Sequence, residues 1–219
     1  MKFTHLTFDC YGTLIDWRNG IETHLGDLLR RNGLTSTTPV YPVYVKFEAE
    51  EEGDYKSYKE IVKDTALKVG GHLGIRITEP DARRFAASIP SWRPFEDTGE
   101  CLKELGRTGH KRVILSNIDR DLLKETVVQN GLDVDGFITA EDVGSYKPSL
   151  GHWNRFFDEY KVSRDATLHV AQSMYHDITP TSKLGLANAW INRYSDSKPT
   201  GINPTYVFSD LRGLVKALS

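Results

Sequence analysis

Short apolar runs alternate with longer amphipathic stretches along most of this chain. Six of the runs, residues 5–8, 112–115, 136–139, 168–171, 189–192 and 205–208, have the length and the continuous apolar character of strands buried on both faces of a parallel sheet. Helical patterns lie between them, at residues 99–108, 120–130, 150–160, roughly 178–186 and 211–218. This alternation predicts right-handed βαβ units in a doubly wound, three-layer α/β fold.

The pattern changes after the first strand, because residues 17–92 contain no strand-like run. They show four helical patterns instead, at residues 21–31, 44–52, 55–69 and 80–87. Gly33 suits the C-terminal end of the first of these helices, and Pro39 and Pro42 interrupt the chain before the second. A structureless connection of this length is implausible in a compact domain. We therefore predict a core domain of residues 1–16 and 93–219 with an all-helical cap subdomain, residues 17–92, inserted into it.

Composition narrows the class of protein. The chain has 219 residues, of which 39% are hydrophobic and 26% are charged. Its formal net charge of -2 is too small to create a strong electrostatic field that would attract nucleic acid or an anionic membrane. No apolar run reaches the length of a membrane span or forms a secretory leader. The two cysteines, Cys10 and Cys101, and the seven histidines lack metal-ligand or disulfide-framework spacing. The expectation is a cytoplasmic protein without a nucleic-acid or membrane partner.

Polar side chains gather where four of the predicted elements end. Asp9 directly follows the first strand, Ser116 and Asn117 follow the second, Lys147 lies in the loop after the third, and Asp177 lies in the loop after the fourth. Ligands of open α/β sheets bind beyond the carboxyl ends of the strands. A carboxylate held there by turn amides and a nearby lysine stays ionised and aimed, as a nucleophile must be.

Each of these residues also has an ordinary structural interpretation. Asp9 can cap the next turn, and Ser116 with Asn117 can simply close one. A loop lysine such as Lys147 is usually solvated, and Asp177 can be the N-cap of the helix that begins near Thr179-Pro180. The convergence of four segments at one sheet edge favours the functional interpretation over these separate ones.

Taken in order, the segments FDCYGTLID, ILSN, GSYKP, HVAQSMYHDITPTSKLGL and AWINR resemble the haloacid dehalogenase superfamily over essentially the whole chain. The resemblance implies a Rossmann-like core, and the helical insertion makes the chain most similar to the L-2-haloacid dehalogenase group. It implies that Asp9 displaces halide to form an ester, which water near Asp177 then hydrolyses. Thr13 and Lys147 would hold Asp9, while Ser116 and Asn117 would bind the carboxylate of a small substrate.

Two positions bear on the choice between dehalogenase and phosphatase. The superfamily's phosphatases have a second Asp two residues after the nucleophile and a Gly-Asp pair that binds Mg²⁺, whereas here Tyr11 and Ala171-Gln172 stand at those positions. A tyrosine with a free pKa of about 10 is a poor acid for this purpose, and an amide weakens a site for a hard dication. The resemblance thus implies no cofactor. A Mg²⁺-dependent small-molecule phosphatase that uses Asp9 and Asp177 as ligands is the alternative.

The chain also departs from the dehalogenases. Their cap helix carries a halide-binding arginine, but the stretch VYPVYVKFEAEEE offers only Lys46. The Ser and Asn that precede the final Asp in that group are replaced here by Gln172 and Met174, although Ser173 remains between them, and Trp153 replaces a tyrosine after the KP segment. We therefore expect Tyr11, Ser116, Asn117, Lys46, Trp153 and Ser173 to contact the substrate, although Lys46 also suits a solvated helix and Trp153 the core. Cleavage of another carbon-heteroatom bond and metabolite binding without turnover stay open, and the resemblance suggests a homodimer.

Overall fold

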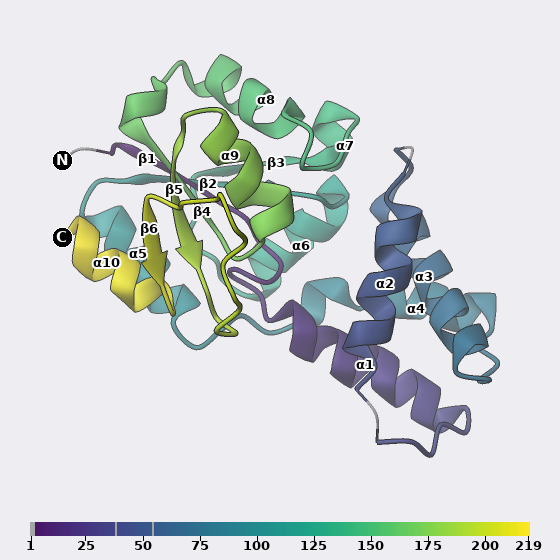
Figure 1. Ribbon diagram of the computed structural model, residues 1–219. Coiled ribbons are helices and arrows are strands. Elements are labelled where there is room, and N and C mark those ends of the chain that lie inside the picture. The colour runs from purple at the N-terminus through teal and green to yellow at the C-terminus, as the bar shows by residue number, and fades with distance from the viewer. Residues whose placement is uncertain (1–2, 38, 54) are drawn as a thin grey trace.

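The computed structural model describes residues 3–37, 39–53 and 55–219. Its centre is a sheet of six parallel strands: β1 (His5–Phe8), β2 (Lys111–Ser116), β3 (Gly136–Thr139), β4 (Thr167–Ala171), β5 (Ala187–Ile191) and β6 (Tyr206–Phe208). The strands lie in the order β3-β2-β1-β4-β5-β6, so β1 is central and the chain winds outward in both directions (Figure 1). The doubly wound parallel sheet predicted from the sequence is confirmed.

Helices cover both faces of the sheet because successive side chains of each strand point in opposite directions. Ile114 faces the side covered by α5 (Thr98–Arg107), α6 (Arg120–Gln129) and α10 (Leu211–Leu218). Its neighbours Val113 and Leu115 pack on the opposite side with α8 (Gly151–Tyr160). The short helices α7 (Ala140–Val143) and α9 (Thr179–Lys183) follow β3 and β4. Three layers result, with an apolar core on each side of the sheet.

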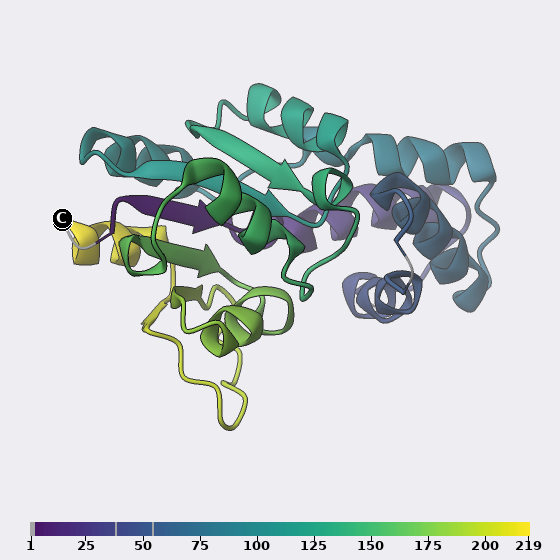
Figure 2. The ribbon, with the colours of Figure 1, turned by 90° about the horizontal axis from the view of Figure 1, so that it is seen from above.

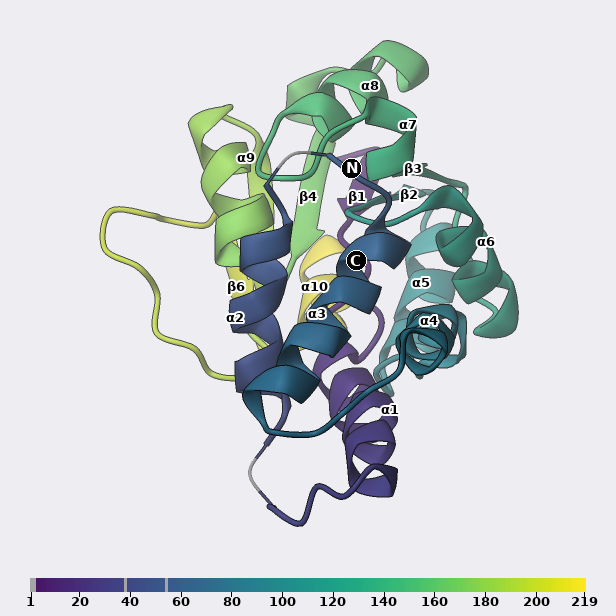
Figure 3. The same ribbon diagram turned by 90° about the vertical axis from the view of Figure 1, so that its right-hand side faces the viewer.

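Within the described residues, the insertion after β1 contains four α-helices, α1 (Trp17–Arg31), α2 (Tyr41–Glu51), α3 (Tyr58–His72) and α4 (Glu79–Ala87), followed by a 3₁₀ turn, Ile89–Ser91. Ser57 and Thr78 cap the N-termini of α3 and α4 through their side-chain oxygens. Gly33, with a φ of 106°, follows the end of α1 as the sequence predicted. Figure 2 shows the strands pointing towards this group of helices, and Figure 3 shows the helices in front of the sheet. The helices therefore lie beyond the carboxyl ends of the strands.

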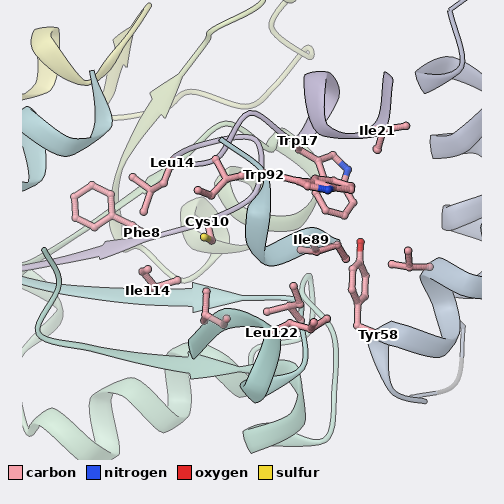
Figure 4. Packing of buried hydrophobic residues seen from close by; sticks show 14 of the residues in the cluster. Phe8, Cys10, Leu14, Trp17, Ile21, Tyr58, Ile89, Trp92, Ile114 and Leu122 are labelled. Atoms are coloured by element: carbon pink, nitrogen blue, oxygen red, sulfur yellow. The ribbon is translucent and has the colours of Figure 1, made fainter. Parts of the chain in front are cut away.

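Aromatic packing joins the insertion to the core at the two places where the chain passes between them. The indole rings of Trp17 and Trp92 lie 4.7 Å apart between centroids (Figure 4). Gly20 makes this contact possible, because a Cβ there would lie only 2.1 Å from a ring atom of Trp92. Both tryptophans belong to one apolar cluster that continues through Cys10 and Leu14 into the sheet. Cys10 is thus a packing residue.

Hydrogen bonds add a second connection. The carboxylate of Asp119, at the start of α6, accepts the backbone N–H groups of Tyr58 at 2.9 Å and Lys59 at 2.8 Å. The first turn of α3 is therefore capped by a residue of the core. The Tyr146 hydroxyl donates to the carbonyl of Lys56 at 2.6 Å.

No helix within the described part of the chain has the length and apolarity needed to cross a membrane.

Candidate active site

A cavity of about 670 Å³ lies between the carboxyl ends of the strands and the inserted helices. Its floor comes from the core and includes Asp9, Ser116, Lys147 and Asp177, which the sequence predicted to converge. Its other walls come from α1, α2, the start of α3 and the loop after β5. Aromatic side chains are abundant in the lining: Tyr11, Trp17, Tyr41, Tyr55, Tyr58, Tyr146, Tyr175 and Tyr194.

Asp9 is positioned by the turn that ends β1. Its N–H donates to the Val170 carbonyl of β4 at 3.0 Å, and the turn continues through Gly12, whose φ of 96° favours glycine. The Thr13 hydroxyl donates to Asp9 Oδ2 at 2.7 Å, and Lys147 Nζ donates to Oδ1 at 2.9 Å. The side chain is nearly buried yet borders the cavity. Burial raises the pKa of the Asp9 carboxyl, and the ammonium of Lys147 opposes that shift. A carboxylate fixed in this way can attack a bound substrate.

Lys147 is the centre of the charge network. Its ammonium group donates to Asp9 Oδ1, to Asp177 Oδ1 at 2.7 Å and to the Leu115 carbonyl at 2.9 Å, which uses all three of its donors. Burial alone would lower the pKa of Lys147, but Asp177 and Asp9 outweigh it and the pKa is raised. Lys147 is therefore a fixed cation rather than a solvated loop lysine.

Asp177 lies in a π-helical turn, Met174–Ile178, directly after β4. It is not a helix N-cap, because Ser173 caps this turn and Ile178 precedes α9. Burial opposes its ionisation, but Lys147 and His169 hold the pKa of the Asp177 carboxyl well below its ordinary value. Its Oδ2 atom is buried and has no hydrogen-bond partner among the described residues. This oxygen is the acceptor that the network leaves unused.

Asn117 and Tyr11 border the cavity, but their polar atoms are engaged by the protein. The Asn117 side chain donates to the Lys147 carbonyl at 3.0 Å and accepts the Lys147 N–H at 2.6 Å. The Tyr11 hydroxyl lies 2.7 Å from Thr126 Oγ1 of α6. Asn117 therefore positions Lys147, and Tyr11 offers mainly its ring to the cavity. Ser116 and Ser173 also line it, Ser173 with its hydroxyl bonded to His176.

Two residues expected to bind substrate lie elsewhere. Trp153 is fully buried in the apolar cluster between α8 and the sheet, with its ring 5.3 Å from that of His169. Its position on the inward face of an aromatic-rich helix makes it a core residue. Lys46 is exposed on α2, with its ammonium 5.6 Å from the Phe47 ring, and it does not line the cavity. The helix predicted at residues 44–52 is present as α2 (Tyr41–Glu51), but Lys46 lies on its solvent-facing side.

The sequence interpretation missed a second group of polar residues that border the cavity. Glu48 accepts a hydrogen bond from the Tyr58 hydroxyl, and Glu52 lies 3.2 Å from His176 Nε2. Burial and the neighbouring Glu52 raise the pKa of Glu48 to about 8. The i, i+4 spacing of Glu48 and Glu52 indicates that they lie on the same side of a helix. Nothing in the sequence indicated that this side of α2 faces Asp9.

His169 was missed for a different reason, since it lies within a strand rather than after one. Its Nδ1 is 2.8 Å from Thr7 Oγ1 and its Nε2 is 2.9 Å from Asp177 Oδ1. A fully buried histidine in a parallel strand is more often a core residue. Here it orients the second carboxylate from beneath the site.

The donor set does not fit a resident divalent cation. Asp177 Oδ1 and Asp9 Oδ1 both face the ammonium of Lys147, and position 172 carries an amide. Within residues 3–37, 39–53 and 55–219, no group of three or more His, Cys, Asp or Glu side chains is placed to hold a metal ion. A hard dication needs several oxygen ligands that are not already neutralised.

Comparisons with known proteins agree with this fold. A family model described as haloacid dehalogenase-like hydrolase matches residues 3–179. The (S)-2-haloacid dehalogenase of Pseudomonas putida is 22% identical over 211 residues, which cover 90% of each chain. The structure of L-2-haloacid dehalogenase from Xanthobacter autotrophicus with chloropropionic acid covalently bound superimposes with a TM-score of 0.86, at 20% identity, over 99% of this chain and 98% of that one. The putative HAD-hydrolase YfnB from Bacillus subtilis, bound to magnesium, has a TM-score of 0.82 at 21% identity and covers both chains fully.

The parallel sheet and the charged site at its carboxyl edge define a hydrolase of the α/β class with an inserted helical region. The chain belongs to the haloacid dehalogenase-like hydrolase family.

Proposed function

We propose that this protein is a metal-independent, 2-haloacid dehalogenase-like hydrolase that acts on a small carboxylate through an ester of Asp9. Two observations together support this proposal. Asp9 is held by hydrogen bonds from Thr13 and Lys147, and the residue two positions after Asp9 is Tyr11, whose hydroxyl is bonded to Thr126. A nucleophilic carboxylate without a neighbouring acid suits a leaving group that departs without a proton. Halide is such a group.

The reaction has two displacements. An Asp9 oxygen attacks the carbon that bears the halogen, a carbon–oxygen bond forms, and halide departs with the bonding electron pair. Water then attacks the carboxyl carbon of the Asp9 ester, releasing a 2-hydroxy acid and one proton and restoring the carboxylate. The unused Asp177 Oδ2 is suited to accept a hydrogen bond from that water. Lys147 offsets the negative charge that develops on the Asp9 oxygens.

Ser116 is the residue best suited to donate to the substrate carboxylate, because it lines the cavity beside Asp9. Asn117 supports this site by holding Lys147 in place. Residues 17–92 would act as a cap subdomain on a core of residues 1–16 and 93–219, excluding water during the first displacement. The proposal further includes a cytoplasmic location, no cofactor, and a homodimer in solution.

The test is halide release from L- and D-2-chloropropionate and from haloacetates, each with EDTA and with Mg²⁺. Release should tolerate EDTA and fall at least about 1000-fold in Asp9→Asn, because the nucleophile is lost. Asp27→Asn, an exposed aspartate of α1, is the matched control. A single turnover in ¹⁸O-labelled water should place the label in the Asp9 peptide. Retained turnover in Asp9→Asn, or phosphate-ester cleavage that requires Mg²⁺ without any halide release, would contradict the proposal.

A further inference from the structure

Arg18, the second residue of α1, is a cation that lines the cavity in an unusual setting. Its guanidinium lies near two aromatic rings, with its central carbon 4.7 Å from the centroid of Tyr41 and 4.0 Å from that of Tyr194. Tyr41 begins α2 of the insertion, whereas Tyr194 follows β5 in the core. All three side chains border the same cavity as Asp9. Both rings lie within cation–π distance of the guanidinium. Tyr41 also accepts a hydrogen bond from it, so two of the five N–H donors at most are used by these contacts and the others can reach a ligand.

The charge of Arg18 is not neutralised by the protein. Within the ranges that the structure describes, no carboxylate oxygen lies within 4.0 Å of its nitrogen atoms. The acidic side chains nearest in sequence are otherwise engaged. Glu22 accepts the N–H groups of Val40 at 3.0 Å and Tyr41 at 2.8 Å, and Asp16 accepts the N–H of Asn19 at 3.1 Å.

The other cations of the cavity differ in this respect. Lys147 is bonded to two carboxylates, and His176 lies against Glu52. An anionic ligand would therefore find its unsatisfied partner at Arg18 rather than at the floor. A guanidinium is planar and can offer two parallel N–H donors, the geometry that a carboxylate accepts best.

The size of the cavity points in the same direction. Cavities of about 670 Å³ are large enough to bury drug-sized ligands. A three-carbon haloacid whose carboxylate lies at Ser116 would leave most of that space to water. The aromatic lining suits a longer carbon chain that continues from the reacting carbon towards the insertion.

We propose that Arg18 binds a second anionic group of the substrate, remote from the carbon that Asp9 attacks, so that 2-substituted dicarboxylates are preferred over monocarboxylates of equal length. This inference rests on the proposed function and assigns its substrate class. Arg18 is then a residue that determines specificity. Tyr41 and Tyr194 are positioning residues, because they act by holding its guanidinium.

The experiment compares bromide release from 2-bromoadipate and 2-bromohexanoate, which share a chain length and differ in a terminal carboxylate against a methyl group. The parent should prefer 2-bromoadipate by about tenfold or more in kcat/KM, mainly through KM, since one charge-assisted contact is typically worth that factor. In Arg18→Met the ratio should fall to about one. Arg18→Lys should keep part of it, because the charge remains while the paired donors are lost. Arg31→Met, an exposed arginine at the end of α1, should keep the full ratio.

A thermal-shift titration with adipate and hexanoate separates this inference from the proposed function. Adipate should stabilise the parent more than hexanoate does, and the difference should vanish in Arg18→Met. If neither bromoacid reacts but adipate still binds through Arg18, the dehalogenase assignment fails while the anion site stands. If both bromoacids react at equal rates, or if Arg18→Met keeps the preference, the inference about Arg18 is overturned.

Discussion

The floor of the cavity, which comes from the core, and its roof, which we define as the lining residues of α1 and α2, are built differently. On the floor, Lys147 donates hydrogen bonds to Asp9 and Asp177, and the three residues follow three different strands. Lys147 has no unused donor. On the roof, Glu48 accepts a hydrogen bond from Tyr58. Arg18 contacts the Tyr41 and Tyr194 rings and forms no ion pair with a described residue. The floor is fixed before a substrate arrives, whereas the roof keeps polar groups that a ligand can satisfy. Under the proposed function, the floor carries out the chemistry and the roof selects the substrate.

Replacing the central cation of the floor should have the largest effect. Lys147→Met would leave the Asp9 and Asp177 carboxylates facing one another without a counter-ion. Removal of one partner from a buried ion pair typically costs about 3–5 kcal/mol. We expect loss of measurable halide release and a destabilisation of that order in urea unfolding. Lys124→Met, an exposed lysine of α6, is the matched control, and near-parent stability in Lys147→Met would contradict the pre-formed floor.

A smaller effect is expected beneath the floor, at His169. His169→Leu removes one of the two donors to Asp177 Oδ1 and leaves Thr7 without its buried partner, at a cost of about 1–3 kcal/mol. The pKa of the Asp177 carboxyl should rise towards its ordinary value, so the acid limb of the kcat profile should move to higher pH. His169→Gln, which keeps a donor, should move it less. An unchanged profile in both variants would show that His169 serves packing alone.

The smallest effect is expected at the roof. Because the pKa of Glu48 is raised to about 8 from 4.5, the folded protein keeps a proton between these pH values that the unfolded chain has released. The free energy of unfolding therefore falls as the pH rises through that window. Glu48→Gln should remove this slope. Glu48→Gln should therefore raise Tm at pH 9 and change it little at pH 5.

Differential scanning calorimetry at the two pH values is the measurement. Glu50→Gln, on the exposed side of the same helix, should change Tm equally at both. A pH-independent shift in Glu48→Gln would mean that Glu48 is ionised in the folded protein. The roof would then be as fully charged as the floor.

The difference between floor and roof also explains what the sequence could predict. Ser116 is the last residue of β2, Asp9 directly follows β1, and Asp177 lies in the turn after β4, so recognising the strands was enough to predict that they lie together. All six strands were predicted within two residues of their observed bounds, since continuous apolar runs leave little choice. α2 was located as well, but its orientation about its own axis depends on packing against α1 and α3. For that reason Lys46 was chosen and Glu48 was overlooked.

Trp153 and His169 show a second kind of limit. Both lie on the same side of the sheet with their rings in contact, yet one is core and the other supports the site. A sequence pattern predicts that the side chains at such positions are buried. It does not predict whether a buried ring has a polar partner, as His169 has in Asp177. Arg18 was missed because its pocket-facing position requires Tyr194, which lies far along the chain.

The bond between Lys147 and Asp9 spans 138 positions of the chain, and Lys147 also reaches Asp177. Loop-closure entropy makes contacts of such separation late events in folding. Asp9 therefore acquires its counter-ion only when β1, β2 and β4 have paired and Asn117 has fixed the loop after β3. A partly folded chain carries an ordinary solvated aspartate at position 9. Assembly of the sheet and activation of the carboxylate are thus a single event, and an incomplete molecule holds no reactive centre.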